Sequence, residues 1–331
     1  MKFLVTGCFG FIGFNFINYI KNKYGNDVFI YGIDSIESNC SEKNREISKS
    51  LEGFEHKKID INDIYQESLE KIDIIINFAA ESHVDNSIYN PELFINTNVK
   101  GTAMVANFAI KNEIEKFIHI STDEVYGSNE KNFSLESDKL NPSSPYSSSK
   151  AAAEMILNGY TKTYGYEFIT VRPANNYGIF QQPEKLIPFS VANILSGNSI
   201  EIYGNGDNIR HWLHVDDTCS AIDHLMEKGE INEIYNIGSD FYLSNIELAK
   251  KLLVILDKQE DMIEFVEDRP GHDFRYAVNL DKILSTGWKP SSVFDEKLEE
   301  TVNWYQNNEN WWKNEYENVK TNKRLKRSGL N

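Results

Sequence analysis

The chain has 331 residues, which is long enough for a large core and for two lobes rather than one. Hydrophobic residues make up 40% and aromatic residues 12%, a globular composition that excludes a disordered chain. The formal net charge of -16 argues against a surface that binds nucleic acid or an anionic membrane, because both need a positive field, but it does not exclude a phosphate-bearing substrate.

A glycine-rich stretch follows the first predicted strand. The apolar strand Lys2 to Thr6 is followed by Gly7, Gly10 and Gly13, with the spacing G-x-x-G-x-x-G. Apolar residues then recur at helical intervals, so the glycines lie where a strand turns into a helix. We predict that the N-terminus of this helix binds a dinucleotide pyrophosphate, with contacts from the glycines and from Phe11 and Ile12.

Acidic residues end the second and third predicted strands. The strand Val28 to Ile33 is followed by Asp34, at the distance that a dinucleotide fingerprint requires. A carboxylate there accepts hydrogen bonds from the adenosine ribose and repels a 2'-phosphate, which favours NAD over NADP. Asp60 and Ile61 follow a third strand, Glu55 to Ile59, and are predicted to face the adenine; an ordinary turn after this strand fits Asp60 equally well.

A fourth predicted strand, Asp73 to Ala80, places Ala79 and Ala80 at the nicotinamide end of the cofactor. The polar loop after it contains His83 and Asp85, which fit either a metal site or catalytic dyad, or hydrogen bonds that order the loop. We favour loop ordering, because no third ligand stands at a suitable spacing. A helix is predicted over 92–111.

The fifth predicted strand, Phe117 to Ile120, leads into a polar loop that contains Thr122, Asp123 and Glu124. Ligands of doubly wound sheets bind at such strand ends. A hydroxyl and two adjacent carboxyl groups there indicate acid and base chemistry beyond simple oxidation.

Tyr146 and Lys150 stand four residues apart in a predicted helix, so both side chains lie on one face. The lysine charge is expected to lower the tyrosine pKa towards a useful range.

The remainder of the chain predicts a second lobe. The passage 175–188 is interpreted as an irregular loop over the active site, and a strand with a turn at 200–207, a helix over 218–227 and a strand at 263–266 follow. The short strand Tyr235 to Gly238 is expected to return to the first lobe. We therefore predict an α/β fold with a Rossmann-type doubly wound parallel sheet over 1–175, a return segment near 212–237, and a smaller α/β lobe over 176–331.

Basic residues cluster in this acidic chain, and a diphosphate is their predicted ligand; pairing with nearby Asp and Glu is the alternative. They are Lys185, Arg210, Arg269, His272 and Arg275. No chemistry is assigned to the amphipathic tail that begins at Trp311.

The cysteines Cys8, Cys40 and Cys219 lack the spacing of a zinc site or a disulfide framework, which favours a reducing cytoplasmic setting without a metal. The strand before Gly7 is too short for a signal peptide, and no apolar run reaches membrane-spanning length. We expect a cytoplasmic protein.

Several motifs together resemble one family. Over about residues 1 to 305 the chain resembles the nucleotide-sugar 4,6-dehydratases of the extended short-chain dehydrogenase/reductases, a family typified by dTDP-glucose 4,6-dehydratase. The matching motifs are the glycine triplet, Ala79 to Asp85, Ser121 to Gly127, Tyr146-x-x-x-Lys150, Asn175 to Gly178, Pro183 to Pro188 and Arg269 to Asp273.

The resemblance implies the reaction and its catalytic residues. Tyr146, with Lys150 and Thr122, is expected to remove the sugar 4-hydroxyl proton while a hydride passes from C4 to NAD. Glu124 is expected to remove the C5 proton and Asp123 to protonate the departing 6-hydroxyl, before the hydride returns to C6. Opposite protonation states of the two carboxyl groups are therefore required.

The same resemblance implies a nucleotide-diphosphate sugar substrate and a homodimer, formed through helices at 92–111 and 151–164. The implied substrate-binding residues are His83, Asn175, Lys185, Leu186, Tyr203, Arg210, Asn245, Arg269 and His272.

Two stretches depart from the pattern typical of dTDP-glucose enzymes, namely Ser35 to Cys40 in place of Leu-Thr-Tyr-Ala-Gly-Asn, and His211 in place of an aspartate. A UDP-linked 2-acetamido sugar or its 5,6-unsaturated derivative, with or without inversion at C5, therefore stays open as the substrate. Two other functions are a 4-epimerase, for which Asp123 and Glu124 would be superfluous, and a catalytically inactive dinucleotide sensor, which would not need Tyr146, Lys150 and Thr122 together.

Overall fold

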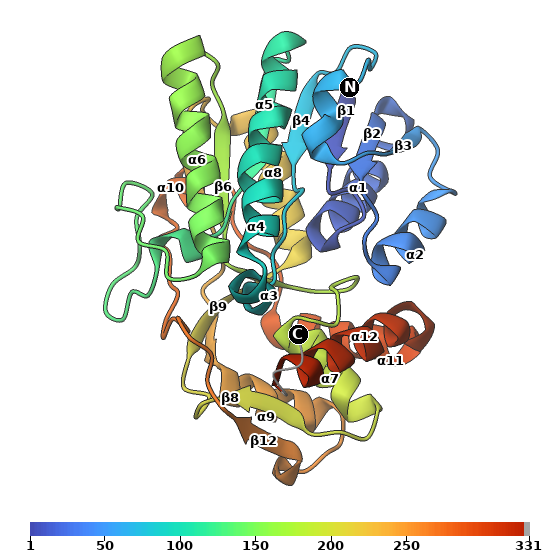
Figure 1. Ribbon diagram of the computed structural model, residues 1–331, viewed down its shortest axis with the longest axis vertical. Helices are drawn as coiled ribbons and strands as arrows, with labels where there is room; N and C mark the ends of the chain where they lie inside the picture. The colour runs from blue at the N-terminus through green and yellow to red at the C-terminus, as the bar shows by residue number, and fades with distance from the viewer. Residues whose placement is uncertain (328–331) are drawn as a thin grey trace.

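A seven-stranded parallel sheet forms the centre of the larger lobe in the computed structural model, which describes residues 1–327 (Figure 1). From β3 to β6 the spatial order is 3-2-1-4-5-6, the order of dinucleotide-binding folds, so the predicted Rossmann-type class is confirmed. The strands are, in spatial order, β10 (Ile234–Ile237), β6 (Ile169–Pro173), β5 (Lys116–Ile120), β4 (Ile74–Asn77), β1 (Lys2–Thr6), β2 (Phe29–Asp34) and β3 (Phe54–Lys58).

Helices cover both faces of this sheet, which explains why its central strands read as continuous apolar runs. Phe3 and Val5 of β1 pack in one cluster with α1 (Phe11–Tyr24) and α8 (Val215–Lys228). Leu4 points to the opposite cluster, with α5 (Thr102–Lys111) and α6 (Pro145–Tyr164). The other helical segments of this lobe are η1 (Gly25–Asp27), α2 (Asn39–Ser48), η2 (Ile61–Gln66), α3 (Val84–Tyr89), α4 (Pro91–Phe94), the π-helical η3 (Ile95–Gly101), η4 (Asp123–Tyr126) and α10 (Asp281–Ser285).

The smaller lobe has two short sheets and its own apolar core, and it lies beyond the carboxyl ends of the large sheet (Figure 1). One sheet has the order β11 (Tyr242–Ser244), β9 (Ile209–His214) and β7 (Asn175–Tyr177), and the other pairs β12 (Ile263–Val266) with β8 (Ile200–Tyr203). Its helical segments are α7 (Leu186–Leu195), α9 (Asn245–Ile255), η5 (Glu260–Met262), α11 (Phe294–Asn307) and α12 (Glu309–Arg327).

The chain crosses between the lobes more than once. After β9 it forms α8 against the large sheet, and β10 then pairs in parallel with β6, with Tyr235 opposite Val171. The segment expected to return to the first lobe therefore forms an edge of its sheet.

The passage 175–188 was predicted to be irregular, and this prediction is wrong at both ends. Asn175 begins β7, which pairs in parallel with β9 opposite Trp212. Pro188 is the third residue of α7. A proline is tolerated there because the first four N–H groups of a helix have no intrahelical acceptor.

Two other predicted elements differ in detail. The helical region that was expected over 92–111 contains the π-helical turn η3 between α4 and α5. The fourth strand ends at Asn77 rather than Ala80, because its partner β1 ends at Thr6, where Gly7 turns the chain with φ +64°.

Two further observations concern the described part of the chain. None of its helices is both long and apolar enough to span a membrane. All three cysteines are buried and free.

Candidate active site

The segment Ser121 to Gly127, which we call the Ser121 turn, directly follows the carboxyl end of β5. The sequence predicted a loop here, but the residues Asp123–Tyr126 within this segment form the short 3-10 helix η4. The Thr122 hydroxyl caps this turn by accepting a hydrogen bond from the Glu124 amide at 3.2 Å. The cap fixes two adjacent carboxyl groups, of Asp123 and Glu124, at the end of the strand.

Tyr146 and Lys150 lie on the first turns of α6. Pro145 and a capping box between Ser144 and Ser147 fix where this helix begins. The Lys150 ammonium donates a hydrogen bond to the Ile120 carbonyl at 2.6 Å, directly before the Ser121 turn.

The expectation that Lys150 lowers the pKa of Tyr146 is wrong for this structure. Burial raises the Tyr146 pKa, the charge of Glu124 raises it further, and a hydrogen bond with Thr122 opposes the shift. The Lys150 ammonium is directed to the Ile120 carbonyl instead. The tyrosine hydroxyl is therefore protonated at rest and is held by Thr122.

The two carboxyl groups of the Ser121 turn differ in their electrostatic surroundings. Burial and the neighbouring Glu124 raise the pKa of Asp123 well above its usual range, with Arg210 opposing, which favours the protonated form of this carboxyl group. Its Oδ2 is buried and has no hydrogen-bond partner among the described residues. Burial also raises the pKa of Glu124, but the charges of Arg269, Lys185 and Arg210 oppose this shift. The surroundings therefore hold a proton on Asp123 more strongly than on Glu124, whose carboxyl group has three opposing cations nearby.

A cavity of about 430 Å³ lies between the glycine stretch and the Ser121 turn, and we call it the glycine-loop cleft. Every predicted cofactor-binding residue lines it: Gly7, Gly10, Phe11, Ile12, Gly13, Asp34, Asp60, Ile61, Ala79, Ala80, Tyr146 and Lys150.

Two glycines of this cleft cannot carry a side chain. A Cβ on Gly13 would lie 2.2 Å from the Gly7 carbonyl oxygen, and one on Gly7 would lie 2.7 Å from the Ala79 nitrogen. Gly10 begins α1 without a side-chain cap, and the first turn of α1 has no acidic residue. The first N–H groups of α1 thus fit a bound pyrophosphate.

Asp34 and Asp60 lie on the β2 and β3 side of the glycine-loop cleft. The Asp34 oxygens accept hydrogen bonds from the amides of Phe9 at 2.9 Å and Ile36 at 2.8 Å, which leaves further lone pairs for ribose hydroxyls. Asp60 accepts from the Asn62 amide at 2.8 Å and so caps η2.

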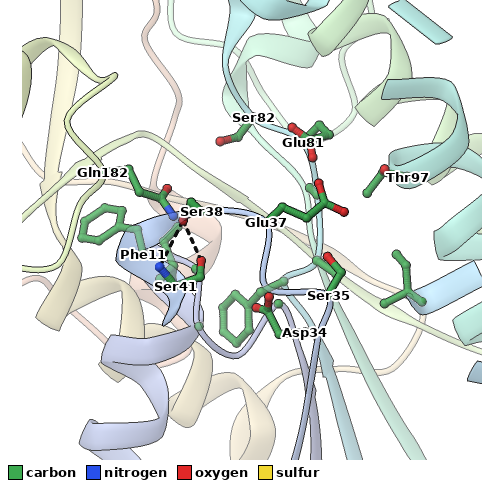
Figure 2. Close-up of a pocket in the computed structure, with 18 of the residues that line it drawn as sticks. Phe11, Asp34, Ser35, Glu37, Ser38, Ser41, Glu81, Ser82, Thr97 and Gln182 are labelled. Carbon is green, nitrogen blue, oxygen red and sulfur yellow. Dashed lines mark hydrogen bonds between the residues drawn. The ribbon is translucent and has the colours of Figure 1, made fainter. Parts of the chain in front are cut away.

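Glu81 projects into the glycine-loop cleft opposite Glu37 (Figure 2). Burial raises the pKa of Glu81 to about 7, with further contributions from the charges of Glu37 and Glu184 and with Lys185 opposing. The sequence motif contained Glu81, but its raised pKa follows from its burial in the cleft and from the nearby Glu37, which the sequence does not show.

A second cavity, of about 180 Å³, lies between the lobes next to Glu124, and we call it the interlobe pocket. Lys185 lines both cavities, so they meet at this residue. All of the predicted substrate-binding residues line the interlobe pocket: His83, Asn175, Lys185, Leu186, Tyr203, Arg210, Asn245, Arg269 and His272.

Several buried polar atoms of the interlobe pocket lack a partner among the described residues. They are Oδ1 of Asn175, Oδ1 of Asn245, Nε of Arg269 and Nδ1 of His83. Buried polar groups are normally hydrogen-bonded, so these atoms fit a pocket that takes a polar ligand with both donors and acceptors.

Asp85 orders the interlobe pocket. Its Oδ2 accepts a hydrogen bond from the Tyr203 hydroxyl at 2.8 Å, and its Oδ1 pairs with Arg269 at 2.9 Å. His83 Nε2 lies 3.2 Å from the Glu184 carbonyl oxygen. The described residues contain no group of three metal-ligating side chains. The contacts of His83 and Asp85 are the kind expected if these residues order the loop by hydrogen bonds.

Arg275 does not line either cavity as described. Its guanidinium donates to the carbonyls of Asn129 and Asn132, both at 2.8 Å, and lies over the Phe133 ring. Its assignment to a diphosphate is therefore wrong, because backbone carbonyls of the 129–132 loop already engage it.

His211, which stands where the family usually has an aspartate, lies on the opposite face of β9 from Arg210. It stacks on Tyr242 at 4.3 Å and hydrogen-bonds with Ser239. Ser35, Glu37 and Ser38 line the glycine-loop cleft instead (Figure 2). Among the described residues, neither His211 nor the stretch Ser35 to Cys40 lines the interlobe pocket.

The C-terminal helix contributes residues that the sequence did not predict. Glu315 and Val319 of α12 line the glycine-loop cleft, and Lys323 lines the interlobe pocket. Trp212 and Glu201 of the second lobe also line the pocket. An amphipathic pattern alone does not show that Glu315, Val319 and Lys323 line a cavity, because this depends on how α12 packs against the two lobes.

Comparisons with known proteins agree with this geometry. A family model described as GDP-mannose 4,6 dehydratase matches residues 4–301. The low-salt glycan biosynthesis protein Agl12 of Haloferax volcanii is 40% identical over 309 residues, which cover 92% of this chain and 98% of that protein. The dTDP-glucose 4,6-dehydratase of Streptomyces niveus is 37% identical over 320 residues, which cover 94% and 95%.

A solved structure is also similar over nearly its whole length. DesIV, a dTDP-glucose 4,6-dehydratase of Streptomyces venezuelae solved with NAD bound, matches with a TM-score of 0.91 at 38% identity, covering 95% of this chain and 100% of that one. The chain thus belongs to the nucleotide-sugar 4,6-dehydratase family of extended short-chain dehydrogenase/reductases.

Proposed function

We propose that the protein is an NAD-dependent hydro-lyase that converts dTDP-glucose into its 4-keto-6-deoxy derivative. The observation that carries this proposal is the Asp123–Glu124 pair, in which burial favours a neutral acid and three cations oppose protonation of its neighbour. Such a pair supplies the acid and the base for loss of water, beside a tyrosine that can act on a hydroxyl.

The dinucleotide is proposed to bind in the glycine-loop cleft, with its pyrophosphate at the N-terminus of α1 and its adenosine ribose at Asp34. The close approach of Gly7 and Gly13 to the backbone supports this fit. Held there, NAD would supply the hydride acceptor for oxidation at C4 of the sugar and the hydride donor for reduction at C6. The carboxylate of Asp34 disfavours the 2'-phosphate of NADP.

Each catalytic residue has one proposed task. Tyr146, next to Thr122 and near Lys150, acts as a phenolate: after its own proton has passed to solvent, it takes the proton of the sugar 4-hydroxyl as C4 is oxidised to a ketone. The ketone acidifies the C5–H bond, and Glu124 removes that proton. Asp123 gives its proton to the 6-hydroxyl, which leaves as water, so that a C5–C6 double bond forms before C6 is reduced and C5 is reprotonated.

The interlobe pocket is the proposed site of the nucleotide diphosphate. Lys185, Arg210 and Arg269 supply the positive charge that an anionic ligand requires. The two departures from the dTDP-glucose pattern lie away from this pocket, which supports dTDP-glucose over the alternative of a UDP-linked 2-acetamido sugar. The similarity to the two dTDP-glucose 4,6-dehydratases of Streptomyces also supports this substrate.

A 4-epimerase is the second candidate function, because it would use the same cofactor and Tyr146. An epimerase has no hydroxyl to expel, so a carboxyl group whose surroundings favour its protonated form, as at Asp123, would have no task. We therefore rank it below the dehydratase.

The test is incubation of the purified protein with dTDP-glucose and, separately, with UDP-GlcNAc. A product that has lost one water and gives alkali-sensitive ketone absorbance from dTDP-glucose is expected. Formation of only a 4-epimer, or no reaction with either sugar, would contradict the proposal. Glu124→Gln should still permit reduction of bound NAD by substrate but should stop elimination.

We further propose a cytoplasmic homodimer. Apolar side chains on η3 and α6 support the dimer, since Ile95, Met155 and Tyr164 are exposed on the helices expected to form it. Light scattering should give twice the mass of the chain, and Met155→Glu should shift the protein towards the monomer; a wild-type monomer would contradict this part.

A further inference from the structure

A buried ion pair lies beneath the Ser121 turn. Glu154 on α6 and Arg172 on β6 are 4% and 2% exposed, and Arg172 Nη2 lies 2.5 Å from Glu154 Oε2. Arg172 Nε lies 3.1 and 3.2 Å from the two carboxylate oxygens, so several charge-assisted hydrogen bonds join the side chains. Neither residue is among the described residues that line the two cavities.

This ion pair contacts both ends of the Ser121 turn. At the start, the Ser121 hydroxyl donates a hydrogen bond to Glu154 Oε1. At the other end, Arg172 Nη1 donates to the Tyr126 hydroxyl at 2.5 Å, and the guanidinium lies 4.7 Å from the centre of the Tyr126 ring. The Tyr126 hydroxyl in turn donates to Asn236 on β10 at 2.7 Å. Thr122, Asp123 and Glu124 therefore lie between two attachments to one ion pair.

The same carboxylate lies near the active-site lysine. Glu154 follows Lys150 by one turn of α6, on the same helix face. Burial lowers the pKa of Lys150 to about 8, and the negative charge of Glu154 opposes this shift. His119 on β5 also faces Lys150, and burial and the Lys150 charge lower its pKa, so it is neutral. The charged group in direct contact with Glu154 is Arg172 on β6, which also contacts the Tyr126 hydroxyl.

We propose that the Glu154–Arg172 ion pair positions the Ser121 turn against Tyr146 and Lys150, and that Glu154 keeps the Lys150 ammonium charged. This inference rests on the proposed function, since it concerns the residues assigned to catalysis there. Glu154 and Arg172 touch neither the glycine-loop cleft nor the interlobe pocket as described, so they are positioning residues rather than catalytic ones.

The variant Glu154→Gln tests the proposal, with Asp223→Asn as its matched control. Asp223 on α8 is also a buried carboxylate, 4% exposed, that pairs with Lys23 and accepts from Tyr24 at 2.9 Å, but it lies away from the active site. Because a small displacement of catalytic groups is costly, kcat should fall about 10- to 100-fold in Glu154→Gln, with KM for the sugar within about three-fold of wild type. Asp223→Asn should lower the melting temperature similarly, with kcat within about two-fold of wild type.

Two milder variants keep the test decisive if Glu154→Gln does not fold. Glu154→Asp retains the charge and should recover most of kcat. Tyr126→Phe removes only the hydroxyl shared by Arg172 and Asn236 and should lower kcat about three- to ten-fold. Wild-type kcat in Tyr126→Phe would overturn the positioning role whether or not Glu154→Gln folds. Equal losses of kcat in Glu154→Gln and Asp223→Asn would also overturn it.

A second measurement needs no substrate and so separates this inference from the proposed function. The 13Cε NMR resonance of Lys150, assigned by its loss in Lys150→Arg, reports the protonation of the amine. Its apparent pKa should fall by about one unit or more in Glu154→Gln and stay near the wild-type value in Glu154→Asp. An unchanged titration in Glu154→Gln would overturn the role of Glu154 even if the wild-type enzyme proved to act on another sugar.

Discussion

Asp85 of the first lobe and Arg269 of the second form an ion pair of 2.9 Å across the interlobe pocket. Burial alone would raise the pKa of Asp85, but the charges of His83 and Arg269 and hydrogen bonds from Tyr203 and Arg269 hold it below its usual range. Asp85 is thus ionised at neutral pH. One carboxylate fixes two of the side chains proposed to bind the diphosphate.

Replacing Asp85 by Asn should therefore weaken substrate binding more than it slows chemistry. We expect KM for the nucleotide sugar to rise about ten-fold or more, because Arg269 loses its charged partner and Tyr203 loses a strong acceptor. Steady-state kinetics and calorimetric titration with the nucleotide diphosphate would measure this. A large fall in kcat with unchanged KM would instead assign Asp85 to the chemical steps.

Lys150 should set the alkaline limit of activity. Its pKa is lowered to about 8 by burial, against the charge of Glu154, so the amine loses its proton as the pH rises through that value. The kcat of the wild-type enzyme should decline above about pH 8. Lys150→Arg keeps a charged group, so its lower activity should lack this decline. The same alkaline decline in Lys150→Arg would show that another group titrates.

Glu81 should make stability depend on pH. Its pKa in the folded protein, about 7, lies above its ordinary value of 4.5, so the folded state binds the proton more tightly than the unfolded state. Stability from this group is present below 4.5 and is lost as the pH rises to about 7.

Glu81→Gln should therefore raise the free energy of unfolding at pH 8 by on the order of 1–3 kcal/mol, and by progressively less at lower pH. Denaturant unfolding at several pH values, at matched cofactor content, would measure the difference. A gain that is constant with pH would mean that the introduced amide acts through packing rather than through the loss of the Glu81 charge.

Gly13 should not accept even a methyl group. A Cβ there would lie 2.2 Å from the Gly7 carbonyl oxygen, which is backbone and cannot move aside without distorting the glycine stretch. Gly13→Ala should lower the free energy of unfolding by about 1–3 kcal/mol and reduce the NAD retained after purification. Gly159→Ala is the matched control, because a Cβ at Gly159 meets nothing within 4 Å. Equal cofactor content in the two variants would contradict this account.

The sequence predicted the larger sheet well because local patterns determine it. Its central strands are buried on both faces and therefore read as apolar runs, and acidic or polar residues mark their ends at Asp34 and Ser121. Residues in such positions gather at one edge of a parallel sheet, so these patterns predicted the main cofactor-binding positions. The substrate-binding set was instead named from the family resemblance.

Features that depend on the contacts between distant segments were beyond the sequence. Arg275 resembles Arg269 and Arg210 in type and neighbourhood, but its partners are carbonyls of a loop over a hundred residues earlier. The pKa of Tyr146 depends on burial and on Glu124 more than on the lysine four residues away. The roles of Glu154 and Arg172 become visible only when α6 and β6 are placed under the Ser121 turn.

The docking of α12 links ligand binding to the order of the C-terminal helix. Trp311 donates to Asn44 at 2.9 Å and Tyr316 to Asn193 at 2.8 Å, so α12 is held against both lobes. Because its residues wall both cavities, a ligand that binds only when α12 is docked adds its binding free energy to that docking. Amide hydrogens of α12 should therefore exchange more slowly with solvent once a ligand fills either cavity. Hydrogen exchange of this helix would then report ligand binding.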